Sequence, residues 1–511
     1  MEPSENEQLQ LLLKAHQDDP EGYQSNLDLG LFLYASRKTR LESARFLAKA
    51  ISHGRLDRHT PLILEFLADL QFLMGNPQAG LETYQLAQKI CPDMIDFVLR
   101  TGDALFRLGH VEEASETFKR AGLHLDGLAD QNPRDENGKR VRFLGPNKVI
   151  LRFFGELALR LDFFLKVRAM NPVPDERPIL LAPTEDVVNP ALLDYFDDKI
   201  EIVRDQAEID TLLATYPNAW IDISYLPIPD GRVLNRNIAL QAVQKKWEDE
   251  GHGPLLQLKP EHEAKGRDLL KQAGLPDDAW FAAIHVREPG YYDEDYPWSR
   301  NLHRSSDIET YTLAIKAIID RGGWVVRLGD PSMKPLAKMD HVIDYAKTEE
   351  LRHDWMDVYL IAAARFILGA PSGPQGPALA FGTPFIGANY FPPGTNPLTC
   401  KDLFIHKLVK SEKTGETLSI AEAIRPPNFM TLEPYIYQSL GLTIHDNTPE
   451  EIRDVTIEMM DRLDGTSETS VDARSRQATY LRLADPYRVG IASNVSDSFL
   501  RNHPELITEN N

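Results

Sequence analysis

The sequence predicts an all-α module of helical repeats followed by two α/β lobes, each a Rossmann-like parallel sheet with helices. Three observations lead to this prediction. Two neighbouring N-terminal segments match at a spacing of 34 residues, short β-branched runs later alternate with amphipathic helices, and this alternation breaks near residues 251–260 and begins again. A chain of 511 residues is also too long for one compact core, so several domains are expected.

The repeats are indicated by small and aromatic residues that recur in the same register. The pairs spaced by 34 residues are Gly75 and Gly109, Gly80 and Ala114, Tyr84 and Phe118, and Ala87 and Ala121. Small residues where two helices cross, with an aromatic residue in the groove between them, are typical of the tetratricopeptide repeat. Residues 27–51 form a weaker third copy, and we assign residues 1–125 to this module. A generic array of helical hairpins is the alternative.

A polar stretch with several Gly and Pro residues follows the repeats, at residues 122–146. Such a composition predicts a linker. Few contacts should then cross between the repeats and the rest of the chain, so the α/β body should fold without residues 1–125.

Residues 146–255 are expected to form the N-terminal lobe, on the acceptor side. Its predicted strands are 148–152, 179–182, 200–203 and 220–224, and its predicted helices are 155–170 and 189–196. Strands that alternate with helices predict a parallel sheet with crossover helices.

Residues 256–490 are expected to form the C-terminal lobe, on the donor side, ending in helices. Its predicted strands are 280–286, 323–328, 341–344, 365–370 and 384–387, and its predicted helices are 307–321, 353–364 and 448–463. The tail beyond residue 493 is polar and is expected to fray.

Composition narrows the class of function. A formal net charge of −21 argues against bulk nucleic acid as the partner, although a local arginine pocket can still hold a nucleotide. Two cysteines exclude a disulfide framework and fit a reducing compartment. The acidic N-terminus lacks the pattern of a signal peptide, and no apolar run approaches the roughly 20 residues needed to cross a bilayer. We expect a cytoplasmic protein, with peripheral membrane contact left open.

Candidate binding residues lie at or just after the ends of three predicted strands of the C-terminal lobe, where ligands of parallel α/β sheets bind. These residues are His285, Arg287, Arg327, Asp330, Ser372 and Gly373. A guanidinium can hold a diphosphate by paired hydrogen bonds, and a hydroxyl beside the free N–H groups of a helix start suits a phosphate. Taken singly, each also fits an ordinary role as a surface arginine, a core histidine or a helix-capping serine.

Together these segments form a longer pattern. H-x-R at 285–287 is followed by R-x-G-D at 327–330, by D-x-x-L-x-x-A-A-x-F-x-x-G-x-x-S-G at 357–373, and by F-G-x-P at 381–384. This pattern resembles the fucosyltransferase-like glycosyltransferases of GT-B fold, in particular bacterial putative glycosyltransferases that carry tetratricopeptide repeats. The resemblance extends over about 148–463 and is sharpest over 285–389.

The resemblance implies an enzyme that transfers a hexosyl or deoxyhexosyl group from a nucleoside-diphosphate sugar to a hydroxyl of a glycan or protein. It implies that Arg287 binds the β-phosphate, His285 lies beside the nucleoside, Asp357 contacts the base and Ser372 binds phosphate. The chain has HVREPGYY where eukaryotic fucosyltransferases have a second arginine after H-x-R, so guanine and fucose specificity do not follow.

Glu156 is our candidate for the general base, with Arg287 stabilising the leaving group. Glu156 lies in the first turn of the predicted helix 155–170, where the helix dipole favours an ionised carboxylate. A plain helix-stabilising role for Glu156 is the alternative, and Asp330 and the acidic loop after residue 290 are the competing bases.

That acidic loop is also the expected acceptor side of the cleft. Its candidate residues are Tyr292, Asp293, Asp295 and Trp298. The D-x-D pattern could hold a divalent cation, but it stands several residues past its strand. We therefore expect no metal, and no cofactor other than the nucleotide-sugar co-substrate.

Two other functions fit the same features. The chain could be a non-catalytic repeat scaffold that binds partners or nucleotides, or a nucleotide-sugar epimerase on the same two-lobed frame. Donor hydrolysis would distinguish a transferase from a scaffold. The repeats make a protein partner or acceptor the more attractive expectation.

Overall fold

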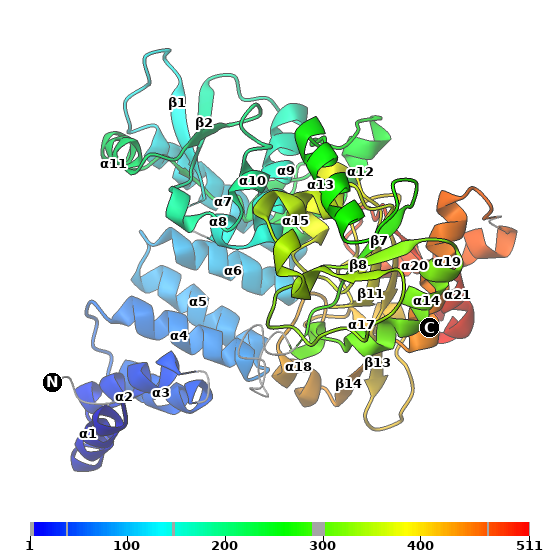
Figure 1. The fold of residues 1–511 in the computed structure, drawn as a ribbon. Coiled ribbons are helices and arrows are strands. Elements are labelled where there is room, and N and C mark those ends of the chain that lie inside the picture. Colours follow the sequence, from blue (N-terminus) through cyan, green and yellow to red (C-terminus); the bar gives the residue numbers. More distant parts are fainter. Residues whose placement is uncertain (1–4, 37–38, 146–148, 289–301, 468–469, 510–511) are drawn as a thin grey trace.

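Helical pairs, a small parallel sheet and a larger parallel sheet follow one another along the chain (Figure 1). The computed structural model describes residues 5–36, 39–145, 149–288, 302–467 and 470–509. The predicted fold class, a helical module before two α/β lobes, is confirmed. No helix in these ranges is both long and apolar enough to cross a membrane.

The N-terminal module consists of helices that each pack on the next. They are α1 (Glu5–Asp18), α2 (Tyr23–Ala35), α3 (Ser43–Ser52), α4 (Thr60–Leu73), α5 (Pro77–Ile90), α6 (Ile95–Arg107) and α7 (Val111–Ala129). Gly75 and Gly109 make the turns inside two of the pairs with φ of 77° and 87°, the left-handed region that glycine enters without strain. Gly80, which is matched with Ala114, lies so close to the ring of Phe72 that a Cβ there would clash with it. The matched glycines therefore mark tight turns and one close helix crossing.

The N-terminal lobe has a four-stranded parallel sheet in the order β3-β2-β1-β4. Its strands are β1 (Arg140–Leu144), β2 (Glu176–Leu181), β3 (Glu201–Val203) and β4 (Trp220–Ile221). Its helices are α8 (Val149–Arg152), α9 (Phe154–Met170), α10 (Pro190–Leu193), α11 (Gln206–Thr215) and α12 (Arg236–Asp249). An antiparallel hairpin, β5 (Tyr225–Pro227) and β6 (Val233–Asn235), lies between β4 and α12.

Two predictions for this region are wrong. The segment 122–146 is no linker, because α7 continues to Ala129 and β1 is an inner strand of the sheet. The segment 148–152 is no strand, because its described part is the helix α8. The strand β1 alternates apolar residues with Arg140 and Arg142, and Arg142 is buried because Asp126 accepts a hydrogen bond from it at 2.6 Å. The ionic partners of these arginines lie in other elements, so the local sequence alone is polar and does not indicate a strand.

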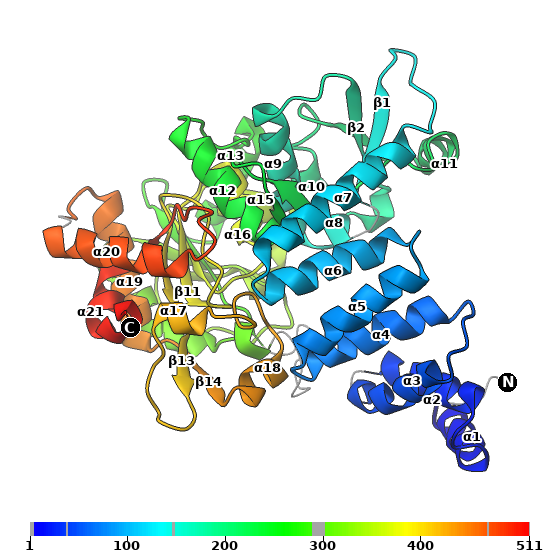
Figure 2. The same ribbon diagram turned by 180° about the vertical axis from the view of Figure 1, so that it is seen from behind.

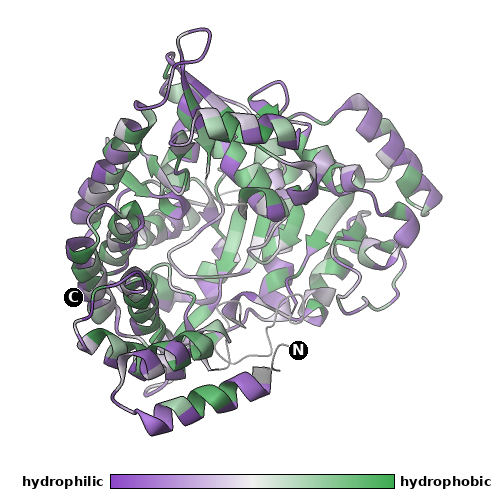
Figure 3. Ribbon diagram, turned by 90° about the vertical axis from the view of Figure 1, so that its left-hand side faces the viewer, coloured by the Kyte–Doolittle hydropathy of each residue, from purple (hydrophilic) through white to green (hydrophobic). Residues whose placement is uncertain are grey.

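The C-terminal lobe has a seven-stranded sheet in the order β15-β12-β11-β10-β7-β8-β9, with every pair parallel. The strands are β7 (Phe281–His285), β8 (Trp324–Arg327), β9 (Val342–Asp344), β10 (Ile367–Gly369), β11 (Phe385–Tyr390), β12 (Leu403–His406) and β15 (Asn494–Val495). In Figure 3 the strands at the centre are largely hydrophobic, whereas the surrounding helices are mixed. This is the pattern of a sheet buried on both faces.

Helices and a small hairpin complete this lobe. The helices are α13 (Pro260–Gln272), α14 (Thr312–Asp320), α15 (Asp354–Ala362), α16 (Gln375–Phe381), α17 (Ile420–Ala423), α18 (Pro434–Ser439), α19 (Pro449–Leu463), α20 (Val471–Ala484) and α21 (Asp497–Asn502), and the hairpin is β13 (Leu408–Ser411) with β14 (Leu442–His445). The predicted helix at 448–463 is confirmed, with Thr448 and Glu451 forming a capping box. The prediction of a frayed tail beyond residue 493 is wrong, because β15 pairs with β12 and Val495 is buried.

The helical module is joined firmly to both lobes (Figure 2). Phe118 of α7 stacks on Tyr225 of the β5–β6 hairpin at a centroid distance of 4.1 Å. Phe106 of α6 meets Phe429 of the C-terminal lobe edge to face, and Gly109 approaches Pro426. A single hydrophobic core runs from the helix pairs into the lobes. The expectation of few contacts across this boundary is therefore wrong.

Candidate functional site

The carboxyl ends of β7 and β10 lie side by side at the point where the strand order reverses. From β7 the chain proceeds to β8 and β9 on one side, and β10 then pairs with β7 on the other side. Ligands of open α/β sheets bind outside such a switch point. Gly369 pairs with His285 there, and a Cβ on Gly369 would lie 2.3 Å from the His285 carbonyl oxygen. The close approach of these strands brings the H-x-R segment against the turn after β10.

His285 and Ser372 meet at this switch point, with 2.8 Å between Nδ1 and Oγ. The Ser372 hydroxyl donates its hydrogen to the Ala370 carbonyl at 3.0 Å, so Oγ accepts from Nδ1–H of a neutral imidazole. Burial, followed by the charges of Arg287 and Arg327, lowers the pKa of His285 to about 4. The ring is therefore neutral at pH 7, and its Nε2 is a hydrogen-bond acceptor.

The turn that carries Ser372 packs directly against the start of α9, in the other lobe. A Cβ on Gly155 would lie 2.6 Å from the carbonyl oxygen of Gly373, and a Cβ on Gly376 would lie 2.3 Å from that of Gly155. The two lobes therefore meet backbone to backbone beside the switch point. Only glycine permits this approach.

Two arginines belong to the same surroundings. Arg287 lies two residues after the end of β7, is partly exposed, and accepts a backbone hydrogen bond from Ser306 at its carbonyl. Arg304 donates from Nη2 to the carbonyl of Pro371 at 2.8 Å, which places a second guanidinium at the Ser372 turn. Sequence reasoning missed Arg304 because it follows no strand, and no spacing within the chain indicates it.

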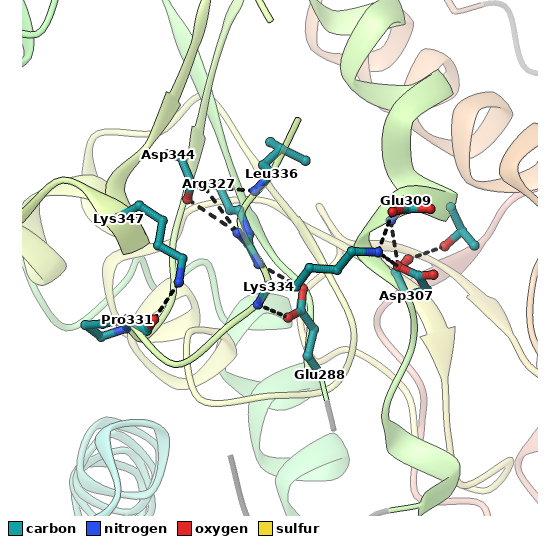
Figure 4. A network of polar contacts seen from close by, with 10 residues as sticks. Glu288, Asp307, Glu309, Arg327, Pro331, Lys334, Leu336, Asp344 and Lys347 are labelled. Atoms are coloured by element: carbon teal, nitrogen blue, oxygen red, sulfur yellow. Dashed lines mark hydrogen bonds and ion pairs between the residues drawn. The ribbon is translucent and has the colours of Figure 1, made fainter. Parts of the chain in front are cut away.

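Arg327 lies at the centre of a polar network in the C-terminal lobe (Figure 4). Its side chain is 1% exposed and donates to Glu288 at 2.8 Å and to Asp344 at 3.3 Å. The other oxygen of Glu288 accepts from the backbone N–H of Lys334 at 2.8 Å, and Asp344 accepts from that of Leu336 at 3.0 Å. Arg327 therefore holds two carboxylates, each of which fixes one point of the loop after β8.

Asp330 lies in that same loop and has a local partner. Its carboxylate accepts from the backbone N–H of Ser332 at 2.8 Å. Burial would raise its pKa, but the hydrogen bonds from Ser332 and the charges of Arg352 and Lys347 lower it. Lys347 in turn donates to the Pro331 carbonyl at 2.5 Å (Figure 4). The geometry gives both Arg327 and Asp330 a role in shaping this loop.

Asp357 lies in the first turn of α15, where it accepts a hydrogen bond from the Tyr345 hydroxyl at 2.6 Å. Burial and the neighbouring charge of Asp354 outweigh this hydrogen bond and raise the pKa of Asp357 to about 6. The carboxyl group thus changes charge near neutral pH.

Glu156 lies in the first turn of α9, next to the Gly155 contact. Its Oε2 accepts from Arg160 Nε and from Arg236 Nη1, each at 2.7 Å. Burial alone would raise its pKa, but the charges and hydrogen bonds of Arg236 and Arg160 lower it to about 2. The carboxylate is ionised as expected, yet it is a weak base held by two cations.

The remaining predicted residues lie outside the described part of the chain. They are the acceptor-side candidates Tyr292, Asp293, Asp295 and Trp298. Within the described ranges, no group of three or more His, Cys, Asp or Glu side chains is arranged to hold a metal ion.

A polar cavity of about 260 Å³ lies between the helix pairs and the C-terminal lobe. It is lined by Tyr34, Arg40, Asp69, Phe72, Leu73, Tyr84, Arg100, Asp103, Ala104, Arg107 and Glu433. Asp103 also reaches the N-terminal lobe, where it accepts from the Tyr225 hydroxyl at 2.9 Å and from Asn235 at 2.8 Å. The cavity is therefore separate from the switch point but shares a wall with the N-terminal lobe.

No protein-family model matches the sequence, and no curated protein matches it. Several solved structures resemble the chain. The structure of E. coli ADP-heptose lipopolysaccharide heptosyltransferase II is 16% identical with a TM-score of 0.35, and the match covers 63% of this chain and 98% of that one. A glycosyl transferase of family 9 from Veillonella parvula is 13% identical with a TM-score of 0.31, over 49% and 80% of the two chains.

A mutant O-GlcNAc transferase from Thermobaculum terrenum matches over a longer stretch. It is 12% identical with a TM-score of 0.25, and the match covers 99% of this chain and 98% of that one. These identities and TM-scores are low. What the chain does is therefore inferred from its own residues.

Proposed function

We propose that this protein is a glycosyltransferase of GT-B type that transfers a sugar from a nucleoside-diphosphate donor to a hydroxyl acceptor. The supporting observation is the switch point between β7 and β10. His285, Ser372 and the N–H groups of a Gly-containing turn meet there, with two arginine-bearing segments beside them and the other lobe directly opposite. A turn with backbone N–H groups, placed between two facing lobes, suits a nucleotide with a diphosphate.

The chemistry is a direct displacement at the anomeric carbon. The acceptor oxygen attacks that carbon, the bond from carbon to the diphosphate oxygen breaks, and the acceptor proton passes to a base. The electron pair of the broken bond stays on the diphosphate, so cations and N–H donors at its phosphates lower the barrier. This mechanism inverts the configuration and requires no metal.

The donor site is assigned as follows. Arg287 and Arg304 neutralise the diphosphate, and Ser372 donates to a phosphate oxygen after releasing the Ala370 carbonyl. His285, neutral at pH 7, accepts from the nucleoside side, and Asp357 contacts the base. Arg327 and Asp330 act indirectly, by shaping the loop after β8.

The finer assignments are also proposals. The sugar is a hexosyl or deoxyhexosyl group, the acceptor is a glycan or a protein, and the reaction takes place in the cytoplasm. The helix pairs are tetratricopeptide-like repeats, which support the two lobes and offer an additional binding surface.

The test is nucleotide binding by Arg287 variants. We expect thermal shift to select one nucleoside diphosphate from the ADP, GDP, UDP, CDP and dTDP series, because a ligand that binds only the folded state stabilises it. Arg287→Ala should weaken the binding of that diphosphate about 10- to 100-fold, as measured by calorimetry, because charged hydrogen bonds contribute about 1.5–3 kcal/mol. Binding of the bare nucleoside should change little.

Two further variants make this result specific. Arg287→Lys should recover only part of the affinity, because the paired geometry of the guanidinium is lost. Arg58→Ala, an exposed arginine between α3 and α4, should bind as the parent does. If no nucleoside diphosphate binds, the proposed function is wrong. If the diphosphate binds equally to the parent and to Arg287→Ala, Arg287 lies outside the site.

A further inference from the structure

A transferase needs a base near the acceptor hydroxyl, and Glu156 is poorly suited to that role. Its Oε2 is shared by Arg160 and Arg236, and a carboxylate with a pKa of about 2 has little affinity for a proton. This ion-paired cluster instead fixes the first turn of α9 beside the Gly373 turn. A carboxylate without ion-pair partners would suit the role of base better.

Asp222 is the first residue after β4, at the edge of the sheet that faces the ligand in parallel α/β lobes. β4 pairs in parallel with β1, and Ile221 lies opposite Leu144. Gly145, the residue after β1, donates its N–H to the Ile221 carbonyl, so Asp222 and Gly145 share one edge of the sheet. Asp222 accepts from the backbone N–H of Ser224 at 2.7 Å, which fixes its carboxylate in a tight turn.

The surroundings of Asp222 differ from those of Glu156. In the described part of the chain, no lysine or arginine lies within ion-pair distance of Asp222, although it is partly buried. Burial, with the like charge of Asp103 on α6, raises its pKa above the ordinary value for aspartate. The hydrogen bonds from Ser224 and the charge of Arg160 on α9 act against this rise.

Two further groups face the same place. Burial lowers the pKa of Arg236 on α12, and the charge of Asp222 acts against this shift. Burial, with the charges of Asp103 and Asp222, raises the pKa of the Tyr225 hydroxyl in the hairpin. The Tyr225 hydroxyl donates to Asp103, which lines the polar cavity at the helix pairs.

We propose that Asp222 is the general base that takes the proton from the acceptor hydroxyl, an assignment that rests on the proposed glycosyl transfer. As the acceptor oxygen bonds to the anomeric carbon, its proton passes to the Asp222 carboxylate. The bond to the diphosphate breaks with its electron pair on the diphosphate oxygen. Glu156 is then a positioning residue, which holds Arg160 and Arg236 and orients the start of α9.

The experiment measures hydrolysis of nucleotide sugars, with water as the acceptor, by the full chain. The panel contains UDP-, GDP-, ADP-, CDP- and dTDP-sugars, and the diphosphate selected by thermal shift identifies the donor. Asp222→Asn should lower the hydrolysis rate about 100-fold or more while leaving the nucleoside diphosphate Kd within about 2-fold. Asp210→Asn, an exposed aspartate on α11 of the same lobe, is the matched control and should keep the parent rate.

The dependence of the rate on pH gives a second measurement that needs no variant. The parent rate should rise with pH through a pKa above about 4, the ordinary aspartate value, because only the ionised carboxylate accepts a proton. Glu156→Gln should lower nucleotide affinity or thermal stability yet keep that rise.

The contradicting outcomes are distinct. If Asp222→Asn keeps the parent rate, or if the parent rate does not vary between pH 4 and 8, Asp222 is not the base. A parent that binds the diphosphate but hydrolyses no sugar from it would also overturn the assignment. A parent that binds no nucleoside diphosphate would show that the proposed function itself is wrong.

Discussion

Replacing Gly376 with alanine should push the two lobes apart at the candidate site. The added Cβ would lie 2.3 Å from the carbonyl oxygen of Gly155 and 3.0 Å from its carbonyl carbon. Ordinary contacts are about 3.5 Å, so α9 and α16 would have to separate by roughly 1 Å. Both groups are backbone, and no side chain can rotate away. Overpacking of this kind destabilises by about 1–3 kcal/mol.

Gly122→Ala is the matched control, because Gly122 also lies in a helix but has no atom within 4 Å of an added Cβ. That change should stabilise by about 0.5–1 kcal/mol, the usual advantage of alanine over glycine in a helix. Differential scanning calorimetry should therefore show the two melting temperatures moving in opposite directions. Calorimetric titration should show weaker diphosphate binding only for Gly376→Ala. If Gly376→Ala melts and binds as the parent does, the backbone contact between the lobes is absent.

Two other predictions follow from the packing and the titratable groups. Removing residues 1–125 should leave an insoluble body, because α6 and α7 bury Phe118 against Tyr225 and share one core with both lobes. Size-exclusion chromatography should compare residues 126–511 with residues 59–511. Only the longer chain should give a monodisperse species. Asp357→Asn keeps an acceptor for Tyr345 but cannot ionise. Since a raised carboxyl pKa means that the folded state disfavours the charge, parent stability should fall as the pH rises from about 4 to about 6 and stay lower above that. The variant should be more stable by about 1–3 kcal/mol at pH 7.5 and nearly equal at pH 4, as measured by urea unfolding; a constant difference across this range would contradict the assigned titration.

The alternation of strands and helices was predictable because each element carries its own hydrophobic period. The inner strands of the C-terminal lobe are apolar runs, and the matched glycines lie in tight turns or, for Gly80, at a helix crossing that only a small residue permits. The strand β1 was not predictable, because the charges of Arg140 and Arg142 are neutralised by Asp126, Asp130 and Glu176, which lie elsewhere in the chain. The two-residue strand β15 has no period at all.

The candidate site divides in the same way. His285 and Ser372 follow strands and could be placed from the pattern alone, and the structure brings them within hydrogen-bond distance. The sequence at the end of β8 suggested a ligand-binding arginine, but Glu288 and Asp344 already engage Arg327. The ionic partners of Glu156 likewise come from two helices. A side chain's type is local information, whereas its partner is known only after folding.

The helix pairs contact both lobes, which ties their state to that of the cleft. Phe118 holds the hairpin of one lobe, and Phe106 and Gly109 hold the other. Rotation of one lobe relative to the other must therefore distort or break at least one of these contacts. If the nucleotide also binds one lobe arrangement more tightly, a molecule that prefers one arrangement when it binds the helices changes the affinity for the nucleotide, and the nucleotide changes the affinity for that molecule by the same factor. In this way docking on the helices and loading of the donor become thermodynamically linked events, although the two places share no ligand.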